Sequence, residues 1–300
     1  MNLSLLWVPV TLIAAAAQTG RNATQRRLTE RIGTVGATQV RFLYGFPFAL
    51  LALALVSLAT GETAPGPNGA FLAYALGGAV AQILATALML SAMRERAFPV
   101  VTAYTKTEPV QVALFGLLLL GDHLTPVTAL AIAVATSGVV LVSLKPGAGL
   151  ASSGLRPVLS GISSGAFFAL AAIGFRGAIL SLDGGSSLVR ASTTLVWGLG
   201  LQTAILLVWL GLFDRRALLE SFKAWRPSLG AGFLGALASQ FWFLGFALTT
   251  AANVRTLALV EVLMAQAVSH RFMAQATSPR ELAGMGLILG GVALLLLAQP

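Results

Sequence analysis

Two glutamates, Glu108 and Glu261, lie inside apolar segments of a chain in which only 10% of the residues are charged. Placing an ionised side chain in hydrocarbon costs about 2.5–3.5 kcal/mol on insertion scales, so each glutamate needs a reason to be there. A carboxylate in such a place can hold a substrate ammonium group or take up a proton. It can also pair with a buried arginine or cap a broken helix as a structural element, and both interpretations stay open.

The segment around Glu108 carries further polar residues at helical spacing. Tyr104, Glu108 and Gln111 stand at i, i+4 and i+7, which predicts one shared helix face and a polar stripe along a substrate pathway. Lys106 lies about 200° around the helix from Glu108, so it is expected to reach a substrate carboxylate, another helix or the membrane interface. Pro109 is expected to be a hinge, because a proline inside a helix removes one backbone hydrogen bond.

Other polar and aromatic residues interrupt apolar segments elsewhere. A lone amide can bind either end of a zwitterion, or it can hydrogen-bond a neighbouring helix. A deep aromatic ring can stack on a substrate or pack in the core, and a glycine can act as a second hinge. The candidates of these three kinds are Gln18, Gln82, Gln240 and Gln266, then Tyr44, Trp197 and Trp242, and finally Gly245.

The composition excludes several classes of protein. The 300 residues are 57% hydrophobic, whereas soluble domains carry about 25% charged residues, so we expect an integral membrane protein. With no cysteine and two histidines, the chain has no set of residues for a metal site, and we predict no cofactor and no enzymatic activity. The net charge of +9 is expected to orient loops at a membrane rather than to bind nucleic acid.

Hydropathy predicts an all-α integral membrane protein with ten transmembrane helices. Each predicted span is about the 20 residues that a helix needs to cross a bilayer, and none alternates with the period of a barrel strand. The spans are 3–20, 37–59, 69–92, 98–120, 126–144, 158–180, 188–212, 228–250, 253–273 and 279–298.

The chain also repeats itself. At an offset of about 153 residues, Glu108 aligns with Glu261 and Gly138 with Gly291. Five spans in each half predict two inverted five-helix repeats, 1–145 and 158–300, joined by a linker at 146–157. Inverted repeats build transporters with a binding site between the halves. Lys106 and Pro109 align with Leu259 and Val262, so the halves are expected to differ there in charge and bending.

Basic residues suggest an orientation. Most lysines and arginines fall in the predicted loops after odd-numbered spans, Arg21 among them. Cytoplasmic loops carry an excess of positive charge, which predicts cytoplasmic odd loops and both termini outside.

Residues 108–142, "EPVQVALFGLLLLGDHLTPVTALAIAVATSGVVLV", resemble the EamA-type branch of the drug/metabolite transporter superfamily. The matching features are Pro109 opening a helix, the turn Leu120-Gly121-Asp122-His123-Leu124 in place of Leu-Gly-Glu-x-Leu, and Gly138-Val139. Gly284, Ile288 and Gly291-Val292 match the closing helix of the second half, but Val262 replaces the proline there. The resemblance implies a secondary transporter of small metabolites that does not hydrolyse ATP. Relatives that export amino acids include an aromatic amino-acid group, and the family habit places the termini inside.

These observations together predict an exporter of amino acids, including aromatic ones, in a bacterial-type inner membrane. It would work by alternating access through a cavity between the halves, as a monomer or homodimer, with protons as one option for coupling. Carriers of cationic drugs or of nucleotide sugars are the alternatives, the latter because Lys106, Arg190 and Arg255 suit phosphates. An intramembrane enzyme or a channel is more remote.

Overall fold

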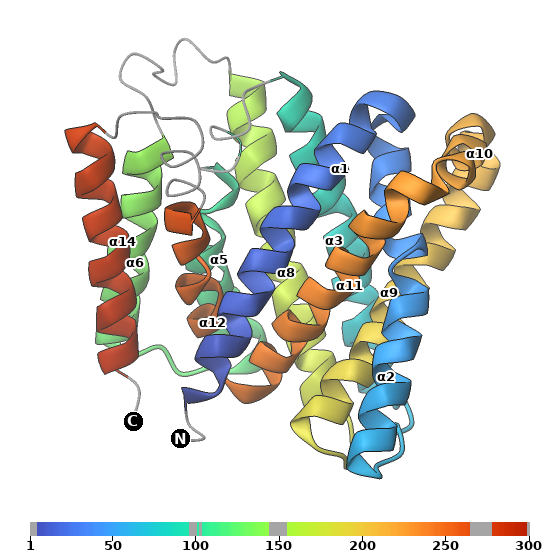
Figure 1. Cartoon of the computed structure of the whole chain (residues 1–300). Helices are drawn as coiled ribbons and strands as arrows, with labels where there is room; N and C mark the ends of the chain where they lie inside the picture. Colours follow the sequence, from blue (N-terminus) through green and yellow to red (C-terminus); the bar gives the residue numbers. More distant parts are fainter. Residues whose placement is uncertain (1–4, 96–100, 102–103, 144–154, 265–277, 299–300) are drawn as a thin grey trace.

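The computed structural model describes residues 5–95, 101, 104–143, 155–264 and 278–298. In this part of the chain every regular element is a helix, and Figure 1 shows the helices as one upright bundle with both ends of the chain at its lower edge. The elements are α1 (Trp7–Leu43), α2 (Phe46–Thr60), α3 (Gly69–Glu95), α5 (Glu108–Phe115), the π-helix η2 (Gly116–Leu120), α6 (Pro126–Ser143), α8 (Leu155–Ser181), α9 (Ser187–Phe213), α10 (Arg215–Lys223), α11 (Trp225–Leu248), α12 (Ala251–Leu257) and α14 (Pro279–Leu297).

Within the described residues, six helical segments are long and apolar enough to cross a membrane. Two shorter apolar helices, Glu108–Leu120 and Pro126–Val142, accompany them. The prediction of an all-helical, multi-pass membrane protein is thus confirmed. Many large apolar side chains, such as Leu58 and Leu118, are exposed on the outside of the bundle. A water-soluble protein would not expose them in this way, whereas lipid accepts them.

The first predicted span and its loop differ from the expectation. α1 continues through Arg21 and turns only at Gly33, whose φ of 72° is a left-handed conformation that glycine adopts without strain. The helix therefore contains one pass and the start of the next, and Arg21 lies inside the bundle with 2% of its surface exposed. Assigning Arg21 to a loop was wrong, because four polar residues around it lowered the local hydropathy. The segment 215–223, also assigned to a loop, forms the amphipathic helix α10.

Helix ends follow local sequence rules. Ser278 and Glu281 form a capping box around Pro279 at the start of α14, with each side chain bonding the other's backbone N–H. Ser186 caps α9, and Glu62 from the distant loop after α2 accepts a hydrogen bond from the Ser186 backbone N–H at 2.7 Å. This hydrogen bond lowers the pKa of Glu62.

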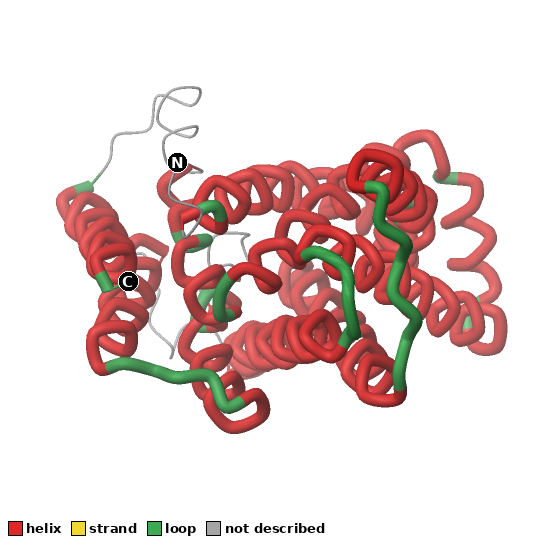
Figure 2. The backbone as a smooth tube through the Cα atoms, turned by 90° about the horizontal axis from the view of Figure 1, so that it is seen from below, coloured by secondary structure: helices red, strands yellow, loops and turns green. Residues whose placement is uncertain are grey.

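The helices pair across the chain in a pattern that an inverted repeat would produce. The most extensive pairs are α3 with α8, α1 with α11, and α6 with α14. In the numbering of the predicted spans these pairs join spans 3 and 6, spans 1 and 8, and spans 5 and 10. A two-fold rotation that exchanges each span with the one five later converts the first pair into the second. The same rotation leaves the third pair unchanged. α6 and α14 run antiparallel and form the pair at one edge of the bundle in both views (Figure 1, Figure 2).

Close helix approach at the α6–α14 pair tests the repeat residue by residue. A Cβ built on Gly138 would lie 2.6 Å from the Gly284 carbonyl oxygen and 2.7 Å from the Ile288 nitrogen. A Cβ built on Gly291 would lie 2.7 Å from the Ala131 carbonyl oxygen and 2.6 Å from the Ala135 nitrogen. Adding 153 to 131, 135 and 138 gives 284, 288 and 291, so the two contacts are equivalent. The repeat offset that the sequence suggested is therefore also the register of this packing.

Candidate functional site

Two buried ion pairs join α5 and its preceding turn to α12 and the segment after it. Lys106 pairs with Glu261, and Arg255 Nε lies 3.0 Å from Glu108 Oε1. All four residues expose 7% or less of their surface. Each pair takes its cation from one half of the chain and its carboxylate from the other. We call these four residues the crossed pairs.

The crossed pairs are reciprocal under the repeat. In each half a cation precedes the glutamate in the sequence, and it pairs with the glutamate of the other half. Lys106 stands two residues before its local glutamate and Arg255 six residues before Glu261, so the cations differ in register by about one helical turn. The halves differ in charge at the aligned positions 106 and 259, but the second half has its own cation, Arg255, about one turn earlier in the sequence.

A break in each helix positions the crossed pairs. The helical backbone is interrupted by a turn at Lys106-Thr107, just before α5, and by another at Ala258-Leu259, just after α12. Pro109 lies in the first turn of α5, where its missing N–H costs no helical hydrogen bond. The second break needs no proline, so the helical backbone is interrupted in both halves, although Pro109 has no counterpart in the second half. Glu108 is thus the first residue of the helical segment after its break, and Glu261 is the second residue of the one after the other break.

The helix break also changes which side chains share a face. Tyr104 packs against Gly161 of α8, and the Gln111 amide oxygen packs against Gly165, one turn further along α8. Glu108 instead faces Arg255 of α12. The predicted stripe of Tyr104, Glu108 and Gln111 is therefore divided between two neighbouring helices, because an ideal helix does not run through the turn at Lys106.

Aromatic rings and an amide surround Arg255. Its guanidinium carbon lies 4.4 Å from the centroid of the Trp242 ring and 5.4 Å from that of Phe246, distances typical of cation–π contacts. The Trp242 indole N–H donates a hydrogen bond to the Gln18 side-chain oxygen at 3.0 Å. Two of the predicted pathway residues, Trp242 and Gln18, thus belong to the surroundings of the crossed pairs.

Other candidate residues hold helices together. The Gln202 amide donates to the Gln82 side-chain oxygen at 2.7 Å, and the Gln240 amide donates to the Ser192 hydroxyl at 2.9 Å. The Tyr44 hydroxyl donates to the backbone carbonyls of Ser221 and Phe222 and so anchors α10. These contacts match the interhelical interpretation that was left open for the amides.

The structure places Trp197 and Gly245, two further predicted site residues, outside the crossed pairs. Trp197, expected to be deep, is 36% exposed and packs edge-to-face on Phe71 at the outside of the bundle. α11 runs without a break through Gly245, which admits the Val254 side chain instead of forming a bend. Gln266 lies outside the described residues.

Arg176 was not among the predicted site residues, yet it joins three elements. Its guanidinium donates to the carbonyls of Phe246 and Thr249, both at 2.6 Å, and to Asp122 Oδ1 at 3.1 Å. The two carbonyls are at the C-terminal end of α11, where no helical partner remains for them. Asp122 belongs to the turn that resembles the family pattern, so this turn serves to fix α8 and α11.

We expect Asp122→Asn to lower the free energy of unfolding by about 1.5–3 kcal/mol, since it removes the charge from a hydrogen bond to a guanidinium. The measurement is reversible unfolding of the purified chain in mixed micelles. Lys223→Gln is the matched control, because it breaks the solvent-exposed pair with Glu220 and should change stability by less than about 1 kcal/mol. Equal losses in the two variants would contradict a structural role for Asp122.

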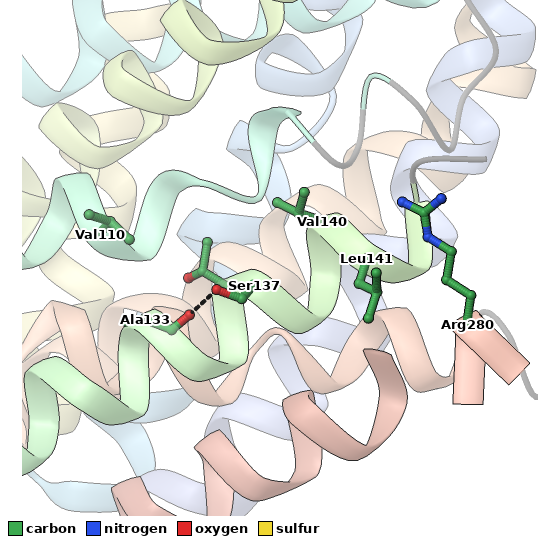
Figure 3. Close-up of a pocket in the computed structure, with 7 residues that line it drawn as sticks. Val110, Ala133, Ser137, Val140, Leu141 and Arg280 are labelled. Carbon is green, nitrogen blue, oxygen red and sulfur yellow. Dashed lines mark hydrogen bonds between the residues drawn. The ribbon is translucent and has the colours of Figure 1, made fainter. Parts of the chain in front are cut away.

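A separate groove opens on the outside of the bundle between α5, α6 and the start of α14 (Figure 3). Its volume is about 420 Å³, and none of the crossed pairs lines it. The lining residues are Val110, Ala133, Thr136, Ser137, Val140, Leu141 and Arg280. The Ser137 hydroxyl donates a hydrogen bond to the Ala133 carbonyl oxygen at 2.8 Å. The groove is mainly apolar and suits a lipid chain better than a polar solute.

Comparison with known proteins supports the resemblance seen in the sequence. Residues 5–144 match the model of the EamA-like transporter family. No curated protein matches the chain. A solved crystal structure of a protein aligns over 99% of this chain and 97% of its own, with a TM-score of 0.71 and 15% sequence identity, which shows a shared fold alone. The aromatic amino-acid exporter group stays a prediction. Residues 5–144 thus match the EamA-like transporter family, as the resemblance indicated, and they lie within a helical, multi-pass membrane protein.

Proposed function

We propose that the chain is a secondary transporter that exports small metabolites, foremost amino acids, by alternating access between its two halves. The single observation that carries this proposal is the crossed pairs. Ionisable residues inside a membrane mark substrate or ion pathways by default. Here they lie at corresponding helix breaks in the two halves, where transporters built from inverted repeats bind their substrates. The EamA-like match supports the transporter class.

The charges of the crossed pairs favour a zwitterion. An α-amino acid carries one ammonium and one carboxylate group. The ammonium can replace a cation at Glu108 or Glu261, while the carboxylate can replace a glutamate at Lys106 or Arg255. Binding then exchanges ion pairs within the protein for ion pairs with the substrate, so no charge is left uncompensated in the buried site. A cation alone would leave Lys106 or Arg255 without a partner.

The crossed pairs also suit alternating access. Both pairs span the two halves, so a rearrangement that separates α5 from α12 must break or exchange them. A substrate that offers both charges lowers the free energy of that rearrangement. The empty carrier, by contrast, stays closed by its own pairs. This coupling favours exchange of substrate for substrate over a leak of ions.

The test is transport by the full chain in proteoliposomes with radiolabelled amino acids, a cationic dye, a nucleotide sugar, and imposed pH gradients. We expect accelerated exchange for an amino acid, and a rise of about 10–100-fold in its apparent Kd in Glu108→Gln, as for a lost charge-assisted contact. Transport of the dye or the nucleotide sugar alone would contradict the amino-acid proposal. Flux that does not saturate with substrate would indicate a channel and contradict alternating access.

The same experiment tests proton coupling. If Glu108 carries the coupled proton, the native chain will accumulate substrate under a pH gradient and Glu108→Gln will exchange substrate without responding to the gradient. An unchanged pH response in Glu108→Gln would exclude Glu108 as the proton carrier.

A further inference from the structure

Two arginines of α1 are buried without a carboxylate partner among the described residues. Arg21 and Arg41 each expose 2% of their surface. The glutamates within the bundle, Glu108 and Glu261, already form the crossed pairs. Of the ten acidic residues in the chain, Glu95 is the one whose side chain lies outside the described part. Neither guanidinium thus forms an ion pair within the described residues, although the Glu261 carboxylate attracts Arg21 through space.

The hydrogen bonds of the two arginines leave donors unused. Arg21 donates from Nε and Nη2 to the Asn22 side-chain oxygen, at 3.2 and 2.7 Å, while its buried Nη1 has no partner. Arg41 donates from Nη1 to the Thr86 hydroxyl at 3.0 Å, while its buried Nε has none. An unsatisfied buried donor costs about 1–3 kcal/mol, more when it is charged. These donors are therefore placed to bind an additional acceptor group.

The two side chains converge on one point of α11. A Cβ built on Gly235 would lie 3.3 Å from Arg41 Cγ and 3.5 Å from Arg21 Cδ, so this glycine makes room for both stems. Trp242, which contacts Arg255, follows Gly235 by seven residues, about 10 Å along the helix axis. The Glu261 carboxylate attracts Arg21, while the Arg255 guanidinium repels both Arg21 and Arg41, so the two arginines are within electrostatic reach of the crossed pairs. The arginine pair thus extends the site of the crossed pairs along α11.

We infer that Arg21 and Arg41 form an oxyanion subsite, so that the substrate carries an acidic group in addition to the charges matched by the crossed pairs. This inference rests on the proposed function and narrows its substrate class. Two planar guanidinium groups whose stems meet at Gly235 suit the two or three oxygens of a carboxylate or a phosphate. The implied substrates are acidic amino acids, or small phosphate esters with the same extended shape.

The separation along α11 supports a second acidic group rather than a single shared one. Gly235, where the stems of Arg21 and Arg41 pack, and Trp242, where Arg255 packs, are about 10 Å apart along the α11 axis. A molecule with acidic groups at both ends can place one at Arg255 or Lys106 and the other at Arg21 and Arg41. Its ammonium group, where it has one, remains available to a glutamate of the crossed pairs.

The experiment combines binding and transport in the full chain. Binding is the rise in thermal midpoint of the purified protein with aspartate, glutamate, glycerol 3-phosphate, alanine or phenylalanine. Transport is exchange of the same radiolabelled compounds in proteoliposomes. We expect aspartate, glutamate or glycerol 3-phosphate to bind and cross. Arg41→Gln should weaken the binding of these acidic compounds about 10–100-fold, as for loss of a charge-assisted contact. The three acidic compounds distinguish carboxylate from phosphate recognition.

Arg226→Gln is the matched control, since that arginine stacks on the exposed Trp225 ring away from the buried site. Arg41→Lys keeps the charge without the planar fork and should lose less affinity than Arg41→Gln, which provides a test if the glutamine variant does not fold. Exchange of alanine or phenylalanine without any acidic compound, unchanged in Arg41→Lys, would overturn the inference and leave the proposed function standing. Arginine-dependent binding of acidic compounds without any transport would support the subsite and contradict the proposed function.

Discussion

Lys106→Met will lower the free energy of unfolding by about 3–5 kcal/mol, because it leaves the buried carboxylate of Glu261 without its countercharge. The double variant Lys106→Met, Glu261→Met should recover most of that loss. Replacing both members of a buried ion pair by apolar side chains of similar volume is often neutral or stabilising. Reversible unfolding of the two variants and the native chain in mixed micelles measures both effects.

The double variant separates folding from function. It should be as stable as the native chain. Its substrate exchange should be at least about tenfold slower, because the site has lost one of the two ion pairs that can bind a zwitterion. Glu108→Met with Arg255→Met is the reciprocal test in the other pair. A single Lys106→Met variant as stable as the native chain would show that the pair is not buried together. A double variant with native exchange would remove the crossed pairs from the transport mechanism.

Gly291→Ala should strongly destabilise the fold, in spite of adding a single methyl group. The added Cβ would lie 2.6 Å from the Ala135 nitrogen, a backbone atom that cannot move without shifting all of α6. Overpacking of this kind costs about 1–3 kcal/mol, and a leucine at the same position should cost more. Gly138→Ala makes the equivalent change from the other helix and should have an effect of similar size.

The same helix supplies the controls. Gly286 and Gly290 of α14 have no atom within 4 Å of a built Cβ. Alanine at either position should stabilise the helix by up to about 1 kcal/mol, since alanine is the better helix former. Thermal unfolding of the four variants in one detergent gives the comparison. If Gly290→Ala were as harmful as Gly291→Ala, the glycines would matter for helix flexibility and not for close approach.

Much of the architecture was predictable because the bilayer imposes it. Helix length and hydropathy predicted a bundle of membrane-spanning helices, and the alignment of Gly138 with Gly291 has the same offset as the glycine contacts between α6 and α14. The errors came from local polar composition. Arg21 lies in a polar stretch that resembles a loop, yet the surrounding helices bury it. Sequence hydropathy cannot distinguish a polar side chain that faces water from one that faces another helix.

The site was predictable in part. The coincidence of Glu108 with Glu261 indicated a shared location, but not the partner of either. Arg255 lies six residues from Glu261, and the turns that bring it opposite Glu108 follow from tertiary packing. No proline lies at the turn at Ala258-Leu259, so the sequence does not indicate a helix break there. A spacing argument based on an ideal helix therefore fails at the positions where the helix is broken.

The contact between α6 and α14 is isologous, in the sense used for two-fold dimers: the same surface is used on both sides, and each contact occurs twice. The chain thus holds within one molecule an interface of the kind that normally joins two subunits. Each half carries one complete copy of that interface, so its geometry does not distinguish the partner half of the same chain from that of a second chain. Exchange of halves between two copies of the chain would therefore preserve every contact between α6 and α14.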